Sequence, residues 1–266
     1  SWLKTNVPTA NQVSSLMGVH SNRLDVSLAS GSRWFHGLRS AAMARIVDLS
    51  APIVHSPPET PGFQRTDIEF FDHAAGAEEV AQLFGLSPRH LRHGEGWTRE
   101  KLHLGTHNST HLDAPYHYNS TIGGQRAETI DELPLERFLA PGVRLDFRHR
   151  EDGDAITSAD LAAALDDVGH ALAPLDIVLL WTGRDAFLQA PDYMRRGPGV
   201  TAEATRWLYD RGVRVMGIDA WGWDRPLHLQ AAEALERDAA GIFWEAHQCD
   251  LPYSQIERLA NLADLP

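Results

Sequence analysis

The chain has little cysteine, a shortage of positive charge and no long apolar run. Cys249 is the only cysteine among 266 residues, so no disulfide can form within the chain and a reducing compartment is permitted. Against 24 lysines and arginines stand 36 acidic residues, and the net charge of −12 argues against nucleic acid and anionic membranes as partners. No run reaches membrane-spanning length, and no basic-then-apolar signal pattern is visible. We therefore expect a soluble, cytoplasmic protein.

The pattern of hydrophobic residues predicts an α/β fold. No low-complexity linker divides the chain, which predicts one domain over residues 44–266 after a weakly patterned arm over residues 1–43. Helical spacing predicts helices over residues 76–84, from Thr157 or Ser158 to Gly169, and from Thr201 to Gly212. Apolar runs predict strands over residues 46–49, 97–104, 143–147, 177–181, 213–218 and 256–262. This mixture predicts at least one helix pair packed on a mixed sheet.

Metal-capable side chains are concentrated in one short segment, HNSTHLDAPYH, which runs from His107 to His117. It contains three imidazoles and one carboxylate, and these ligand types suit zinc, manganese or iron. The alternative interpretation is a polar surface loop, because the chain has 14 histidines. Four such positions match by chance with odds on the order of 10⁻³, so we favour a metal–water site.

The residues around this segment predict a loop or strand end and not a helix. Gly105 precedes it, and Pro115 cannot donate to a helical ladder. In an extended backbone, His111 and Asp113 point to the same side because side chains alternate. Pro115 then fixes a bend that would bring His117 back toward them.

The segment resembles the signature H-x-G-T-H-x-D-x-P-x-H of the cyclase or kynurenine formamidase-like family of metal hydrolases. Further stretches agree in the same order, so that the resemblance covers roughly residues 45–266: Asp48-Leu49-Ser50, Asp176 to Gly183, Gly217-Ile218-Asp219, and Ile256-Glu257-x-Leu259-x-Asn261-Leu262. The resemblance implies a swivelling β/β/α domain with a mixed sheet core, assembled as a homodimer or homotetramer. It also implies one or two zinc or manganese ions per chain.

Carried over by position, the resemblance implies that His107, His111 and Asp113 are metal ligands and that His117 is the catalytic acid or base. A histidine suits proton transfer near neutral pH. Alternatively, His117 is a further ligand or a hydrogen-bond partner of one. The resemblance adds His247 and Glu257 as late ligands.

The chain departs from the family pattern in two places. Ser109 stands where the signature has glycine. An overlapping register from His103 to Asp113 does contain Gly-Thr, but only the register from His107 to His117 retains every ligand. The interval between the two late ligands is about two residues shorter than expected, which makes Glu245 the reserve ligand.

Three tryptophans are candidates for contact with the substrate: Trp181, Trp221 and Trp223. Their alternative role is core packing, and two of them in a pocket would favour a planar aromatic or cyclic substrate. We expect Asp219 and Asp224 to be turn or cap residues. Cys249 has no basic partner specified by spacing and is expected to be a bystander.

The leading hypothesis is a metal-dependent hydrolase that cleaves an amide, N-formyl, lactam or lactone bond of a small cyclic or aromatic compound. A divalent ion held by these ligand types lowers the pKa of bound water to about 7. A second hypothesis is a metal-dependent cyclase or dehydratase of aromatic natural-product biosynthesis. A third is a metal-binding protein without catalysis, although a purely structural site needs no spare histidine.

Overall fold

The computed structural model describes residues 45–266. The arm predicted over residues 1–43 lies outside the described residues. The chain divides into two units, residues 1–48 and residues 49–266, and the second contains every helix and strand described below. Within residues 45–266, no helix combines the length and apolarity that a bilayer crossing requires.

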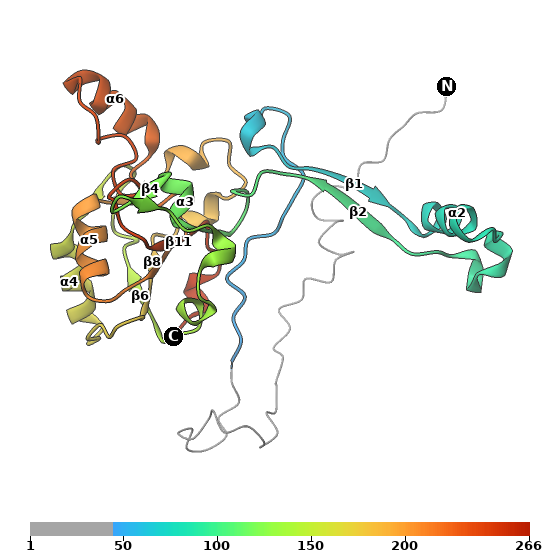
Figure 1. The fold of residues 1–266 in the computed structure, drawn as a ribbon, viewed down its shortest axis with the longest axis horizontal. Helices are drawn as coiled ribbons and strands as arrows, with labels where there is room; N and C mark the ends of the chain where they lie inside the picture. Colours follow the sequence, from blue (N-terminus) through green and yellow to red (C-terminus); the bar gives the residue numbers. More distant parts are fainter. Residues whose placement is uncertain (1–44) are drawn as a thin grey trace, which may run out of the picture. The chain divides into compact units, whose positions relative to one another are not determined.

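A five-stranded mixed sheet forms the centre of residues 49–266, with the strand order β3-β11-β10-β8-β6 (Figure 1). Its strands are β3 (His111–Asp113), β6 (Gly142–Asp146), β8 (Ile177–Trp181), β10 (Val215–Ile218) and β11 (Ser254–Glu257). Strands β6, β8, β10 and β11 are parallel, whereas β3 runs antiparallel to β11. The mixed α/β class predicted from the sequence is confirmed.

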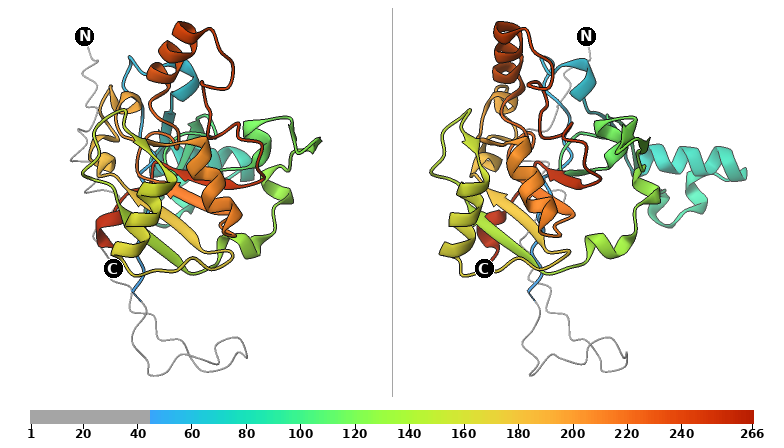
Figure 2. Two further views of the ribbon diagram at one scale, coloured as in Figure 1. Left: turned by 90° about the vertical axis from the view of Figure 1, so that its left-hand side faces the viewer. Right: turned by 60° about the vertical axis from the view of Figure 1, so that its left-hand side comes forward.

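Two helices cover one face of the sheet (Figure 2). Thr157 begins α4 (Ser158–Asp167) by accepting a hydrogen bond from Asp160 N, and Thr201 begins α5 (Ala202–Asp210) in the same way. Leu161 of α4 and Leu208 of α5 are fully buried against the sheet. Each such leucine contributes about 2 kcal/mol through removal of apolar surface from water. The predicted helix pair is therefore present, with its predicted caps.

On the opposite face, Leu179 of β8 packs against Leu259 and Leu262, which follow β11. Strand β11 ends at Glu257 because Arg258 adopts a left-handed backbone conformation, with φ at +57°. The strand predicted over residues 256–262 thus lies earlier in the chain. The chain then packs its leucines under the sheet.

A second group of elements is a two-stranded antiparallel ribbon that carries a helix (Figure 1). The ribbon consists of β1 (Asp67–Phe71) and β2 (Arg99–His103), and α2 (His73–Phe84) follows β1. Asp72 caps α2 by accepting from Ala75 N, and Gly85 ends it at φ +65°. The remaining elements are α3 (Pro115–Tyr118), β4 (Thr121–Ile122), β5 (Gln125–Arg126), β7 (Ala155–Ile156), β9 (Gly199–Val200) and α6 (Leu227–Arg237).

One predicted strand is wrong. Residues 46–49 do not form a strand. Leu49 O instead accepts a hydrogen bond from Ala260 N at 2.9 Å. Pro52 follows closely and has no N–H with which to extend a ladder, so the apolar residues here do not continue into a sheet.

Candidate metal centre

The pairing of β3 with β11 places three candidate ligands together. His111 lies directly opposite Glu257 in the antiparallel ladder, and Asp113 lies opposite Gln255. Alternation along β3 points His111 and Asp113 to the same face, so that His111 Nε2 lies 3.4 Å from Asp113 Oδ1 and 3.7 Å from Glu257 Oε2. Segments far apart in the sequence thus meet through ordinary cross-strand geometry.

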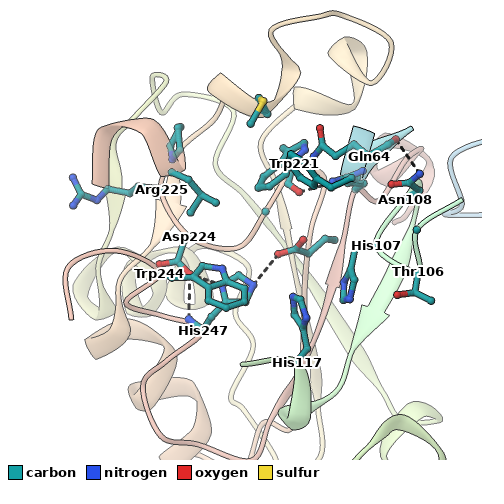
Figure 3. A pocket seen from close by; sticks show the side chains of 18 of the residues that line it. Gln64, Thr106, His107, Asn108, His117, Trp221, Asp224, Arg225, Trp244 and His247 are labelled. Atoms are coloured by element: carbon teal, nitrogen blue, oxygen red, sulfur yellow. Dashed lines mark hydrogen bonds and ion pairs between the residues drawn. The ribbon is translucent and has the colours of Figure 1, made fainter. Parts of the chain in front are cut away.

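The loop before β3 and the turn after it bring two further histidines to this point. His107 Nδ1 lies 2.8 Å from Asp113 Oδ1. Pro115 begins the short helix α3, and the fixed φ of this proline turns the chain back. His117 then stacks on His107 with ring centroids 3.8 Å apart. Both rings border the same pocket (Figure 3).

The clustered atoms fit a divalent cation. Two groups of three side chains each have their ligand atoms within 4.8 Å of one another: His107, Asp113 and His117, and His111, Asp113 and Glu257. His107 Nδ1, His111 Nε2 and Asp113 Oδ1 are buried and lie close to one another, but none of them has a well-aligned hydrogen-bond partner. Buried polar atoms without partners are rare, and a cation would satisfy all three. Asp113 belongs to both groups, so the geometry accommodates one ion or two.

Contacts outside the cluster orient the His111 ring. Its Nδ1 lies 3.0 Å from Ser109 O and donates to it, so that the lone pair of Nε2 faces the carboxylates. Ser109 itself has φ +57°, a conformation that favours glycine, and its Oγ donates to Ala51 O at 2.8 Å. The left-handed backbone explains why the family signature has glycine at this position. It also favours the register from His107 to His117.

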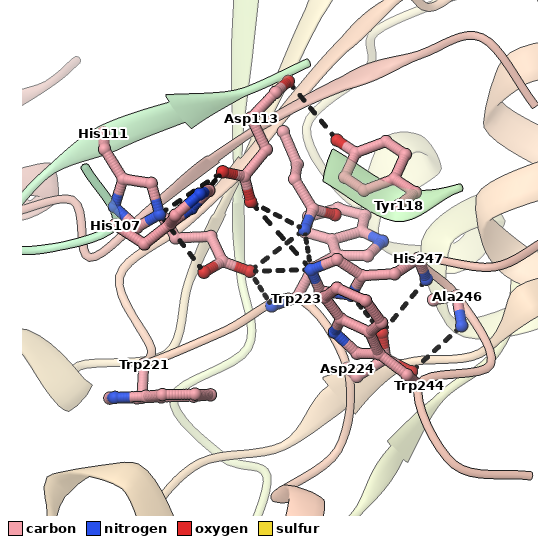
Figure 4. A network of polar contacts seen from close by, with 12 residues as sticks. His107, His111, Asp113, Tyr118, Trp221, Trp223, Asp224, Trp244, Ala246 and His247 are labelled. Carbon is pink, nitrogen blue, oxygen red and sulfur yellow. Dashed lines mark hydrogen bonds and ion pairs between the residues drawn. The ribbon is translucent and has the colours of Figure 1, made fainter. Parts of the chain in front are cut away.

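His247 approaches the cluster from the loop before β11 (Figure 4). Its Nδ1 donates to Asp224 Oδ2 at 2.5 Å, and its Nε2 lies 3.4 Å from Glu257 Oε1. The same Nε2 lies 4.0 Å from Asp113 Oδ2 and contacts the amide nitrogen of Gln255. Among the described residues, the two compact groups of three do not include His247.

The pKa values of His117 and His247 are shifted in opposite directions. Loss of hydration is the main cause that lowers the pKa of His117 to about 4. The neighbouring imidazoles of His107 and His247 contribute to this lowering, whereas Asp113 opposes it. Burial also lowers the pKa of His247, but the hydrogen bonds to the Asp224 and Glu257 carboxylates outweigh it and raise that pKa to about 9. At neutral pH His117 is therefore a neutral imidazole that can accept a proton.

A cavity of about 380 Å³ opens onto the cluster. Trp221 lines it, as does Trp244, whose indole stacks on the His247 ring at 4.3 Å. Trp223 is instead fully buried and its Nε1 donates to Thr205 Oγ1, while Trp181 lies beneath the Arg148 guanidinium at 3.6 Å. Of the three predicted tryptophans, the structure thus brings Trp221 to the cavity, and substrate contact stays a prediction.

Sequence reasoning missed three contributors to this site: Trp244, Asp224 and Gln255. Asp224, expected to be a turn residue, accepts from both the backbone and the ring of His247. Its only sequence signal is its place after the Trp-Gly-Trp stretch, which does not reveal a partner in a distant loop. The reserve ligand Glu245 accepts from Ala202 N and does not line the cavity. Burial raises the pKa of the Cys249 thiol to about 12, consistent with a bystander.

Comparisons with known proteins identify a family for this chain. A family model described as "Putative cyclase" matches residues 47–225. An isatin hydrolase of Roseibium aggregatum is 28% identical over 130 residues, which cover 46% of this chain and 49% of that protein. The match thus spans about half the length of this curated relative.

Solved structures of isatin hydrolase A share the fold. The enzyme from Labrenzia aggregata has a TM-score of 0.60 at 24% identity, covering 84% of this chain and 83% of the other. The enzyme from Ralstonia solanacearum has a TM-score of 0.59 at 23% identity, covering 84% and 81%. Because the family model spans more than half of the sequence, including the whole segment from His107 to His117, the chain belongs to the putative cyclase family.

Proposed function

We propose that this protein is a metal-dependent hydrolase that cleaves a C–N or C–O bond in a small cyclic or aromatic compound. The observation that carries the proposal is the convergence of buried ligand atoms of His107, His111 and Asp113 at a point that adjoins a cavity lined by His107, His117 and Glu257. Two aromatic side chains, Trp221 and Trp244, border the same cavity and suit a planar ring. The names of the similar isatin hydrolases support the same class of reaction.

The proposed metal is zinc or manganese, because imidazole and carboxylate ligands suit both. His107, His111, Asp113 and Glu257 would hold it, and His247 Nε2 lies close enough to join them after a small shift of Gln255. When bound, such an ion supplies an activated water and polarises the scissile carbonyl.

The protein's own residues would then manage orientation and protons. His117 is neutral at pH 7 and faces His107 and the cavity, so it can take a proton from the attacking water and pass it to the leaving group. Asp224 accepts from Nδ1 of His247 and so orients the ring with Nε2 toward the candidate ligands. The Trp221 and Trp244 side chains exclude water from the sides of a bound ring.

Elemental analysis of protein purified without chelator tests the metal, and a panel of arylformamides, cyclic amides and lactones tests the reaction. We expect stoichiometric zinc or manganese, together with turnover that is abolished by chelator and restored by the ion. Absence of both bound metal and turnover would sink the proposal.

The family description favours keeping a second candidate, a cyclase or dehydratase. The two chemistries differ in whether water enters the product. Reaction in ¹⁸O-labelled water therefore separates them, because hydrolysis of an amide or lactone places one labelled oxygen in the new carboxylate.

A further inference from the structure

Arg258 directly follows the candidate ligand Glu257 and lines the cavity. Its Nε donates a long hydrogen bond to Trp221 O at 3.3 Å, and its guanidinium carbon lies 5.0 Å from the centre of the Trp221 ring. Among residues 45–266, no carboxylate oxygen lies within 4.0 Å of the Arg258 guanidinium, the upper limit for an ion pair. Its terminal N–H groups have no acceptor among the same residues.

The other two arginines that line the cavity differ in this respect. Arg225 places its terminal nitrogen 2.8 Å from Glu233 Oε2, and Arg196 places its own 2.6 Å from Asp192 Oδ2. Their charges are compensated by carboxylates of the chain. Arg196 and Arg225 each retain a buried Nε without a hydrogen-bond partner, but their terminal nitrogens face carboxylates. Among the described arginines that line the cavity, Arg258 is the one whose terminal nitrogens face no carboxylate, so they are available to a bound molecule.

The backbone conformation of Arg258 also indicates a functional role for its side chain. Its φ of +57° lies in the left-handed region that glycine and asparagine adopt far more easily than a long side chain does. Such strain persists where the surrounding structure holds it, and it is concentrated at functional sites. Glycine would adopt this backbone conformation more easily, so the backbone does not explain why an arginine occupies the position.

Charge compensation of the nearby Glu257 and Asp113 carboxylates does not explain the arginine either. Glu257 and Asp113 attract Arg258 electrostatically, but neither lies within ion-pair distance. Both belong to the candidate metal centre, where a divalent cation would balance their charges. The positive charge of Arg258 is then left to face the cavity and whatever binds there.

We propose that Arg258 and the face of Trp221 form an anion subsite, so that the substrate is a cyclic or aromatic compound bearing its own carboxylate or similar anionic oxygen group. The guanidinium would donate two parallel hydrogen bonds to the anion while the ring packs against the indole. This inference deepens the proposed function and rests on it for the identity of the substrate. The anion subsite itself is tested by binding alone.

Two probes separate charge from shape: benzenesulfonate and its neutral analogue methyl phenyl sulfone. Both carry a phenyl ring and a sulfonyl group, and sulfonate is a weak metal ligand, so direct coordination contributes little to the comparison. Using metal-loaded full-length protein and calorimetry, we expect benzenesulfonate to bind about 10- to 100-fold more tightly than the sulfone. Equal affinities would overturn the proposal without any variant.

Arg258→Gln should remove most of that preference, whereas Arg258→Lys should retain part of it as a point charge. The matched control is Arg211→Gln, because Arg211 also donates to the carbonyl of a tryptophan, Trp207, and stacks on its ring at 3.6 Å. Arg211 lies outside the cavity, so the control should bind both probes like the wild type. An unchanged preference in Arg258→Gln would overturn the subsite.

Arg258→Gly distinguishes a ligand-binding role from a structural one. Glycine relieves the left-handed strain, so we expect an unchanged or higher unfolding midpoint together with loss of the preference for the anion. A lower midpoint with the preference retained would instead show a structural arginine. Hydrolysis is measured in a separate experiment. A preference for the anionic probe without turnover would contradict the proposed function alone, and turnover without the preference would contradict the anion subsite alone.

Discussion

Asp224 Oδ2 accepts a 2.5 Å hydrogen bond from Nδ1 of His247, and the same carboxylate oxygen accepts from the His247 backbone N–H at 3.1 Å. Gln230 and Ala246 N donate to the other oxygen, Oδ1. Burial would raise the pKa of Asp224, but the hydrogen bond from His247 and these further donors lower it overall. The carboxylate thus stays ionised and fixes the orientation of the His247 ring.

The first prediction is that Asp224→Asn weakens metal binding by about 10- to 100-fold, because the partner of a ligating histidine sets its orientation and basicity. The measurement is competition with a chromophoric chelator. Asp250→Asn is the control, since Asp250 also accepts a backbone N–H but on the exposed surface. Wild-type affinity in Asp224→Asn would remove the role of this carboxylate at the metal.

The second prediction concerns His117. Replacement by alanine should preserve the metal content and reduce kcat by about 10²- to 10⁴-fold, the range lost when a general acid or base is removed. Elemental analysis and steady-state kinetics on the same preparation check both halves. Unchanged kcat would refute the acid–base assignment. Loss of one equivalent of metal would instead make His117 a ligand, which its place in one of the two groups also allows.

The third prediction is a pH-dependent contribution to stability, remote from the cavity. Asp176 is buried and accepts hydrogen bonds from Ala173 N at 2.9 Å and His170 Nε2 at 2.8 Å. Burial raises the pKa of Asp176, but these two hydrogen bonds outweigh burial and bring the pKa below its ordinary value. The stabilisation by Asp176 is therefore complete above the ordinary pKa of about 3.9 and is lost as pH falls through the lower folded-state pKa.

Accordingly, Asp176→Asn should lower the free energy of unfolding by about 2 kcal/mol at pH 7, with the difference shrinking below about pH 4. Urea titrations of chelator-treated protein at several pH values measure it. Asp167→Asn, at an exposed carboxylate at the end of α4, is the control. A difference that grows toward acid pH would contradict the lowered pKa of Asp176.

The fourth prediction tests a close backbone approach behind the site. A Cβ added at Gly199 would lie 2.0 Å from Arg225 N and 2.2 Å from the carbonyl carbon of Asp224. The backbone must shift to admit it, so Gly199→Ala should cost about 2 kcal/mol or more and displace Asp224 from His247. Gly62→Ala is the control, because a Cβ there meets nothing within 4 Å. Equal unfolding midpoints for the two variants would show that the backbone around β9 accommodates a Cβ without cost, which would contradict this prediction.

Local patterns predicted the local features of this fold. Capping residues and glycines marked the ends of α4 and α5, and the apolar run at Ile177–Trp181 coincides with β8. Alternation and Pro115 anticipated the geometry of the segment from His107 to His117. These features depend on neighbours a few residues away, which sequence reasoning can evaluate.

The partners that sequence reasoning missed are set by tertiary register. Asp224 meets His247 because two loops beyond the strand ends come together. Trp223 is buried in the main hydrophobic core, where its Nε1 donates to Thr205 on α5. Neither relationship leaves a periodic signal. The candidate late ligand Glu257 was identified only through family resemblance, since an isolated glutamate in a strand has no distinguishing pattern. The expected homodimer or homotetramer stays a prediction.

The position of β3 at the edge of the sheet has a consequence for how the protein matures. Among the strands of residues 45–266, β3 pairs with β11 alone, and β11 is synthesised long after it. During synthesis, the segment from His107 to His117 therefore emerges before the strand with which it pairs. The proposed metal centre would therefore be complete only after Glu257 of β11 has been synthesised, so a truncated chain that ends before β11 should bind the ion more weakly.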